Sequence, residues 1–232
     1  MEAADERAAV ILLAAGVGRR VGADEPKAFL TIGGRPILAV AAGAAAASPL
    51  VGSVVVTAPA GWEDRARGCV EGCGVPAEVV TGGTTRQESV RAALAVLPSG
   101  IRVVAVHDAA RPFAPPDLFT SVIDSVSDET PGVVPVSAVA DTVKQIDAGR
   151  VVGTLDRAGL GLAQTPQAFD VVVLRAAHHQ AAVDGVELTD DAAALERTGV
   201  AVRAVAGDPN NVKITTLLDL ANADARMGGV DG

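Results

Sequence analysis

Residues 10–38 read VILLAAGVGRRVGADEPKAFLTIGGRPIL, and this strand and loop determine the predicted fold. The apolar run 10–13 predicts a buried strand. The loop that follows holds two glycines, Gly16 and Gly18, whose backbone N–H groups no Cβ shields, so an anion can approach them closely. The same loop carries three cations, Arg19, Arg20 and Lys27. Glycines and cations together predict a loop that binds a triphosphate.

Two better-known glycine-rich loops do not fit this stretch. A P-loop requires G-x-x-x-x-G-K-[ST], and no Gly-Lys pair occurs here. A dinucleotide-binding fingerprint requires G-x-G-x-x-G, but Val21 occupies the third glycine position and Gly22 follows one place late. The next predicted strand also ends without the acidic residue that would bind a ribose. A plain glycine-rich turn remains as an alternative, although it would not require three neighbouring cations.

The composition narrows the class of protein. With 232 residues, 49% of them apolar, the chain can bury a core, and we expect one domain over residues 1–232. Aromatic residues make up 2%, and the net charge is −9. These values argue against a nucleic-acid-binding protein, which needs stacking rings or a basic surface. A locally positive loop in an acidic protein suits a small anionic ligand.

The cysteines and the first residues of the sequence indicate the cellular compartment. Cys69 and Cys73 have no second cysteine pair, so no zinc pattern can be assembled, and reduced thiols are typical of a cytoplasmic protein. Residues 1–9 do not resemble a signal or transit peptide. The apolar run 39–47 is too short to span a membrane. We therefore expect a cytoplasmic protein that does not contact a membrane.

Alternating strand and helix patterns predict the fold class, which is α/β. We expect a single Rossmann-like domain, with a mainly parallel twisted sheet and helices on both faces. The predicted strands are 10–13, 53–59, 77–81, 103–106, 132–139, 200–205 and 212–214. The predicted helices are 36–47, 62–72, 85–97, one that begins at Pro116, 170–183, one that Thr189 caps, and 217–226. Residues 140–160 lack the helical period and predict a β-arm.

The residues that follow the predicted strands point to one binding site. In a parallel sheet, ligands bind beyond the carboxyl ends of the strands. Glycines, hydroxyl groups and charges concentrate in five segments at these ends, namely 16–27, 82–89, 108–111, 140–160 and 207–213.

Several motifs carry a resemblance to a known family. They are LLAAGVGRRVGADEPKAFLTIGGRPIL, VHDAARPF, DRAGL, TPQAF, LTDDAAALE and NNVKITTLLDL. In this order, from about residue 9 to residue 226, the chain resembles the 2-C-methyl-D-erythritol 4-phosphate cytidylyltransferase family of the nucleotidyltransferase superfamily. The resemblance implies a step of the non-mevalonate pathway of isoprenoid biosynthesis. In that reaction the phosphate of methylerythritol phosphate attacks the α-phosphorus of CTP, and pyrophosphate leaves.

The resemblance also implies roles for individual residues. The matching catalytic residues are Arg20, Lys27, Arg157 and Lys213. The matching nucleotide-binding residues are Ala14, Ala15, Gly16, Gly18, Arg19, Gly83, Thr84 and Ser89. The matching substrate-binding residues are Arg111, Thr142, Arg157, Thr165 and Lys213. Asp108 would bind Mg²⁺, a hard ion that prefers carboxylate and phosphate oxygens.

Some assignments keep an alternative. The family often has Asp where this chain has Thr84. Spacing alone does not separate Arg19 from Arg20 as the residue that contacts the transition state. We expect His107 to be structural, because the attacking phosphate is already anionic and needs no base. The pair Asp190 and Asp191 either belongs to the site or supports a helix N-terminus.

Two other functions share most of these features. One is a cytidylyltransferase for another polyol phosphate, such as ribitol 5-phosphate. The other is a catalytically silent nucleotide-binding relative, which would tend to lose the set Arg20, Lys27, Asp108 and Lys213. The resemblance further implies a homodimer, in which the arm at 140–160 crosses to the partner and helps to complete its substrate site.

Overall fold

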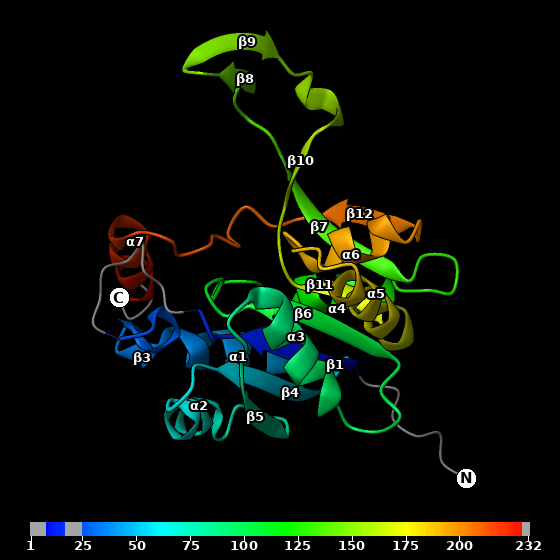
Figure 1. Ribbon diagram of the computed structural model, residues 1–232. Coiled ribbons are helices and arrows are strands. Elements are labelled where there is room, and N and C mark those ends of the chain that lie inside the picture. Colours follow the sequence, from blue (N-terminus) through cyan, green and yellow to red (C-terminus); the bar gives the residue numbers. More distant parts are fainter. Residues whose placement is uncertain (1–7, 17–24, 229–232) are drawn as a thin grey trace.

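Strand β1 (Ala8–Leu13) lies inside the sheet of the computed structural model, which describes residues 8–16 and 25–228 (Figure 1). All of its residues except Leu13 are buried, as expected for a strand that is covered on both faces. It pairs in parallel with β4 (Val51–Ala58) on one side and with β6 (Val103–Asp108) on the other. The loop after β1 therefore opens at the carboxyl edge of the sheet, as predicted.

The main sheet has eight strands in the order β10-β7-β11-β6-β1-β4-β5, with β12 paired to β7. The other strands are β5 (Ala77–Thr81), β7 (Gly132–Ala138), β10 (Gly161–Ala163), β11 (Gln167–Asp170) and β12 (Val202–Ala206). In the described part of the chain, four pairings of this sheet are parallel, namely β1 with β4, β1 with β6, β4 with β5 and β7 with β12. Strands β10 and β11 run antiparallel to their neighbours. The predicted α/β class and mainly parallel sheet are confirmed, and the two antiparallel strands are an addition.

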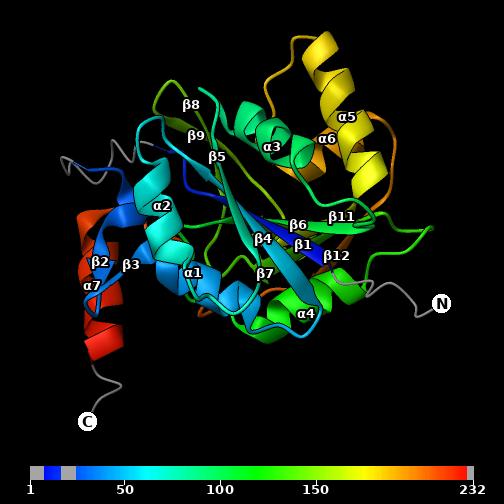
Figure 2. The same cartoon turned by 90° about the horizontal axis from the view of Figure 1, so that it is seen from below.

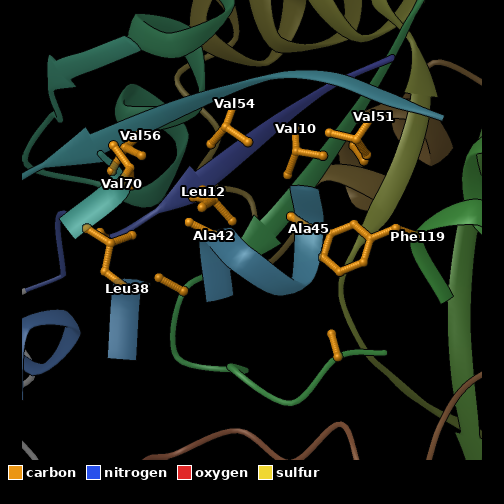
Figure 3. Close-up of a cluster of buried hydrophobic side chains, with 14 of the residues drawn as sticks. Val10, Leu12, Leu38, Ala42, Ala45, Val51, Val54, Val56, Val70 and Phe119 are labelled. Carbon is orange, nitrogen blue, oxygen red and sulfur yellow. The ribbon is translucent and has the colours of Figure 1, made fainter. Parts of the chain in front are cut away.

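Helices cover both faces of the sheet because successive side chains of β1 point to opposite faces. Val10 and Leu12 join one buried cluster, and Ala9 and Ile11 join another. The first cluster includes residues of α1 (Ile37–Ala46), α2 (Glu63–Val70) and α4 (Pro116–Asp124). The second includes residues of α3 (Arg86–Ala95), α5 (Val171–Val183) and α6 (Asp191–Arg197). Figure 2 shows the two groups on opposite sides, and Figure 3 shows the first cluster.

Two sequence predictions are wrong in detail. Residues 212–214 do not form a strand, because Ile214 makes a single backbone bond to the Ala110 carbonyl at 2.8 Å instead of entering a ladder. Helix α6 is capped by Asp190 and not by Thr189, since the Asp190 carboxylate accepts the N–H of Ala193. The capping box predicted at the start of α3 is confirmed, with Thr85 and Glu88 as its two members.

A small third cluster joins the C-terminal helix to the loop after β1. Helix α7 (Leu217–Gly228) packs against the hairpin of β2 (Thr31–Ile32) and β3 (Arg35–Pro36). The Gly33 N–H donates to Asp224 at 2.8 Å, and a Cβ on Gly33 would lie 2.6 Å from Met227 Cβ. This packing holds the 3₁₀ turn η1 (Lys27–Phe29) near the segment that precedes α7.

The predicted arm is confirmed as a hairpin that projects from the sheet (Figure 1). It consists of β8 (Lys144–Asp147) and β9 (Arg150–Thr154), followed by the turn η2 (Arg157–Gly159). Ala148 and Gly149 have φ of 45° and 77°, the positive values that a tight two-residue hairpin turn of this kind requires. Large apolar side chains are exposed along the arm and the strand after it, namely Ile146, Val151, Val152, Leu155, Leu160 and Leu162.

Among residues 8–16 and 25–228, no helix has the length and apolar character that crossing a bilayer requires.

The packing of α4 gives a stability prediction. Phe119 is fully buried in the first cluster (Figure 3), with its ring centroid 5.0 Å from that of His107. We expect Phe119→Ala to lower the free energy of unfolding by about 3–5 kcal/mol, because it leaves a cavity beneath the sheet. Urea unfolding at pH 7 measures this loss. Ser121→Ala on the exposed face of the same helix is the control, and equal midpoints for the two variants would contradict the prediction.

Candidate active site

A cavity of about 390 Å³ opens at the carboxyl ends of β1, β5 and β6. Four of the five segments predicted from the sequence meet there. The predicted site residues that line it are Ala14, Ala15, Gly16, Lys27, Gly83, Thr84, Ser89, Asp108 and Lys213. Gly18, Arg19 and Arg20 lie outside the described residues. The segment 140–160 contributes no residue to the described lining of this cavity.

The turn after β5 lies unusually close to the loop after β1. A Cβ on Gly82 would lie 2.3 Å from Ala15 Cβ, and a Cβ on Gly83 would lie 2.1 Å from Glu88 Cβ. Only glycine allows this approach. The buried Ser89 hydroxyl accepts the Gly83 N–H at 3.1 Å and donates to the Thr85 carbonyl at 3.0 Å. The two loops predicted to bind the nucleotide therefore form one wall of the cavity.

Thr84 is held by the first turn of α3. Its backbone N–H and its hydroxyl both donate to Glu88 Oε2, at 2.7 and 2.6 Å. These hydrogen bonds, with that from the Thr85 N–H, lower the pKa of the Glu88 carboxyl, which is therefore an acceptor. Because the Thr84 hydroxyl gives its proton to Glu88, its oxygen is left with acceptor lone pairs only.

Asp108 and Lys213 both line the cavity and form an ion pair with each other. Lys213 Nζ lies 2.5 Å from Asp108 Oδ2, and Arg86 Nε lies 3.9 Å from Asp108 Oδ1. Burial alone raises the pKa of the Asp108 carboxyl, but the cations of Lys213 and Arg86 outweigh burial and hold that pKa below its usual value. The carboxylate is therefore charged at neutral pH, at the end of β6 where the sequence predicts a ligand-binding acid.

His107 and Thr165 fix the position of Asp108 from beneath. The Thr165 hydroxyl accepts the Asp108 N–H at 3.0 Å and lies 3.0 Å from His107 Nδ1. His107 Nε2 lies 3.1 Å from the Arg111 carbonyl, which can only accept. The set is satisfied if Thr165 donates to Nδ1 and Nε2 carries the imidazole proton. His107 is thus structural, as predicted. The hydroxyl proton of Thr165 forms a hydrogen bond to His107.

Lys27 lines the same cavity, beside the segment that carries Lys213. Its ammonium group donates to the Ile214 carbonyl at 2.6 Å, one residue beyond Lys213. The segment 213–215 therefore carries one lysine of the site, Lys213, and binds the other, Lys27. Helix α7, which follows this segment, packs on the hairpin that follows Lys27. This arrangement brings residues from opposite ends of the sequence to one face of the cavity.

Four predicted substrate-binding residues lie apart from the cavity lining, namely Arg111, Thr142, Arg157 and the buried Thr165 described above. Arg111 donates to the Asn211 carbonyl at 2.7 Å and to the Ala163 carbonyl at 3.5 Å. Thr142 and Arg157 are exposed on the arm, where Arg157 donates to the Ala140 carbonyl. Within one chain, the described residues do not bring Thr142 or Arg157 to the cavity.

The sequence reasoning missed one cation of the site. Arg86 lines the cavity, and its guanidinium donates to the fully buried carboxylate of Asp191 at 2.5 Å. Its position directly after the capping Thr85, in the segment 82–89, was an available signal. The partner Asp191 lies 105 residues further along the chain, where no local pattern marks the contact.

The carboxylate of Asp108 suits one mode of magnesium binding. Among the described residues, no group of three or more His, Cys, Asp and Glu side chains could hold a metal by itself. Mg²⁺ is commonly bound by one or two carboxylates together with substrate phosphates. A single charged carboxylate beside two lysines in the same cavity fits that mode and does not fit a preformed protein cage.

The fold and this arrangement of charge belong to the nucleotidyltransferases, whose ligands bind beyond the carboxyl ends of parallel strands. A model of one family in this class, 2-C-methyl-D-erythritol 4-phosphate cytidylyltransferase, matches residues 8–229. The chain belongs to this family. The predicted family, fold and enzyme class are confirmed, and membership favours the methylerythritol phosphate reaction over the ribitol phosphate and silent alternatives.

Relatives and solved structures agree with this membership. A 2-C-methyl-D-erythritol 4-phosphate cytidylyltransferase from Nocardia farcinica is 44% identical, over 98% of this chain and 97% of the relative. The enzyme of the same name from Thermus thermophilus has a crystal structure with a TM-score of 0.79 and 32% identity, over 95% and 99% of the two chains. A 4-diphosphocytidyl-2C-methyl-D-erythritol synthase from Anaerococcus prevotii has a TM-score of 0.85 and 28% identity, over 97% and 100%.

Buried His107 gives a prediction about pH. Burial lowers its pKa from 6.5 to about 4. The unfolded chain therefore binds the proton first as the pH falls, and the folded state loses stability between pH 6.5 and 4 and not above. We expect this group to account for about 3 kcal/mol of that loss.

Urea unfolding of wild type and His107→Gln at several pH values measures this contribution. The variant is not expected to titrate at this site, so its stability relative to wild type should rise as the pH falls toward 4. A difference that stays constant between pH 7 and pH 4.5 would contradict the neutral, buried state of His107.

Proposed function

We propose that this chain transfers the cytidylyl group of CTP to 2-C-methyl-D-erythritol 4-phosphate and releases pyrophosphate. The observation that carries the proposal is the meeting of Lys27, Asp108 and Lys213 in one cavity with the backbone of two glycine-containing loops. The glycine-containing wall suits the nucleotide, and the cations suit two phosphate-bearing substrates that must approach each other.

The wall formed by residues 82–89 would bind the base. Thr84 Oγ1 donates to Glu88, so toward a ligand it offers an acceptor. Cytosine carries an exocyclic amino donor where uracil carries a carbonyl acceptor. A Thr84 oxygen in this state therefore favours cytosine and supports the choice of CTP, even though the family often has Asp at this position.

The cations would act on charge that develops during transfer. In phosphoryl transfer, positioning and electrostatic stabilisation supply most of the catalysis. Lys27 would stabilise the triphosphate side, together with Arg20, and Lys213 would hold the attacking phosphate. No general base is required, because the attacking oxygen is already anionic, in agreement with the structural role of His107.

Magnesium completes the proposed site. Asp108 is the residue that would hold it, together with phosphate oxygens of the nucleotide. The ion would supply positive charge that neutralises the triphosphate and the leaving pyrophosphate. Lys213 contacts Asp108 Oδ2, so the ammonium is placed to move to a phosphate when the carboxylate gains another partner.

The arm supports a homodimer with shared sites. Ile146, Val151 and Val152 are between 63% and 68% exposed, and such apolar side chains are costly in water unless a partner covers them. Thr142 and Arg157 lie on the same arm, apart from the cavity of their own chain. We therefore assign them to the substrate site of the partner.

Free Cys69 and Cys73 agree with the reducing cytoplasm as the proposed location.

An assay of purified protein tests the reaction. We expect pyrophosphate release only when CTP, Mg²⁺ and 2-C-methyl-D-erythritol 4-phosphate are all present, because each supplies one part of the charge balance in the cavity. ATP in place of CTP, ribitol 5-phosphate in place of the substrate, and chelation of the metal are the controls. Equal turnover with ribitol phosphate or with ATP would refute the proposed specificity.

Mixed dimers test the shared site. Lys27→Ala and Arg157→Ala proteins should each be nearly inactive alone. After they are unfolded and refolded together, each mixed dimer should hold one site with both wild-type residues, because two-fold symmetry makes the exchange reciprocal. Random mixing should therefore restore about a quarter of the wild-type activity.

The control for this experiment is Arg150→Ala, which removes an arm cation that has no proposed contact with substrate. It should be active alone, which shows that loss of charge on the arm does not by itself disrupt assembly. If mixed dimers of the two inactive variants form and stay inactive, Arg157 acts within its own chain and the shared site is wrong.

A further inference from the structure

Arg86 connects the cavity to a buried carboxylate behind it. Its Nη2 donates to Asp191 Oδ2 at 2.5 Å, and the Asp191 side chain is 0% exposed. Asp191 Oδ1 in turn lies 3.0 Å from Nε2 of His178, whose side chain is 1% exposed. The guanidinium at the first position of α3 is therefore anchored by groups on α6 and α5.

The other side of the same guanidinium faces Asp108. Arg86 Nε lies 3.9 Å from Asp108 Oδ1, whereas Lys213 contacts the second oxygen, Oδ2. Each oxygen of the carboxylate thus faces a different cation. Because the planar guanidinium presents donors in several directions, it can bond Asp191 and stay beside Asp108 at once.

The two cations differ in how firmly they are held. Lys213 is a point charge on a flexible stem, its side chain is 40% exposed, and it lies in a segment without regular structure. Arg86 is bound to a buried carboxylate, and a buried charge that loses its partner is strongly destabilising. Lys213 is therefore free to exchange Asp108 for a phosphate, whereas Arg86 stays with Asp191.

We propose that Arg86 is a positioning residue for the transfer reaction, which holds the Asp108 carboxylate in place while Lys213 engages the attacking phosphate. Asp191, supported by His178, keeps the guanidinium in position for this role. The inference rests on the role of Asp108 in the proposed function. The alternative is that Arg86 serves only to tie α3 to α6.

Arg86→Lys separates the two explanations. A single ammonium group is compact and cannot bond Asp191 while it also holds a charge beside Asp108. We expect it to pair with Asp191, because that carboxylate is fully buried. The tie between α3 and α6 then remains, and only the cation beside Asp108 is lost.

The experiment compares Arg86→Lys, Asp108→Asn and the double variant in steady-state and single-turnover kinetics, with urea midpoints for each. We expect Arg86→Lys to lower kcat by about 10–100-fold, with the KM for CTP and the urea midpoint close to wild type. When Arg86→Lys is added to Asp108→Asn, kcat should fall little further, because the two substitutions remove the same interaction between Arg86 and Asp108.

Arg175→Lys is the matched control. Arg175 donates to the Leu94 carbonyl at 2.7 Å, so it also ties a helix to α3, but it does not line the cavity. Its kcat should stay near wild type. If Arg86→Lys does not fold, the pair Arg86→Met with Asp191→Leu removes both charges together, and it should show the same loss in kcat.

Three results would overturn the inference. They are a folded Arg86→Lys protein with wild-type kcat, an equal loss in Arg175→Lys, or a full additional loss in the double variant. Wild-type activity of Asp108→Asn would instead refute the role of Asp108 itself, and the inference with it. An inactive Asp108→Asn beside a fully active Arg86→Lys refutes the inference alone.

Discussion

The ion pair between Lys213 and Asp108 is the interaction on which the arrangement of the site depends. It joins the end of β6, in the middle of the sheet, to the segment between β12 and α7. The same segment accepts Lys27 through the Ile214 carbonyl and bonds the Ala110 carbonyl through the Ile214 N–H. One short stretch therefore sets the position of both cationic sides of the cavity, and α7 holds it from outside.

This placement explains why the fold needs a rigid β1 and a crowded turn after β5. β1 is buried on both faces, so the point where its loop begins is fixed by packing from two layers. Gly82 and Gly83 then bring a second loop within contact distance of Ala15 and Glu88. The backbone N–H groups of Gly82, Gly83 and Thr84 all donate to acceptors within the protein, so internal hydrogen bonds fix the shape of this turn before any ligand binds.

The sequence predicts those features that depend on local signals. The apolar run of β1, the capping box at Thr85 and the acid at the end of β6 are all encoded within a few residues, and the structure confirms them. Strands β10 and β11 are three and four residues long, too short to show alternation. The ion pair of Arg86 with Asp191 spans 105 residues and has no local signature. Thr189 and Asp190 are both good caps, and only the backbone geometry selects Asp190.

Several cations can share one cavity because each has its own acceptor. Lys27 donates to a backbone carbonyl, Lys213 to Asp108 and Arg86 to Asp191. Like charges at short range would otherwise repel and destabilise the fold. The two carboxylate partners differ in burial, since the Asp191 side chain is 0% exposed and that of Asp108 is 14% exposed. A phosphate that enters the cavity can therefore compete with Asp108 for Lys213, whereas Arg86 keeps its buried partner and preserves the geometry around Asp108.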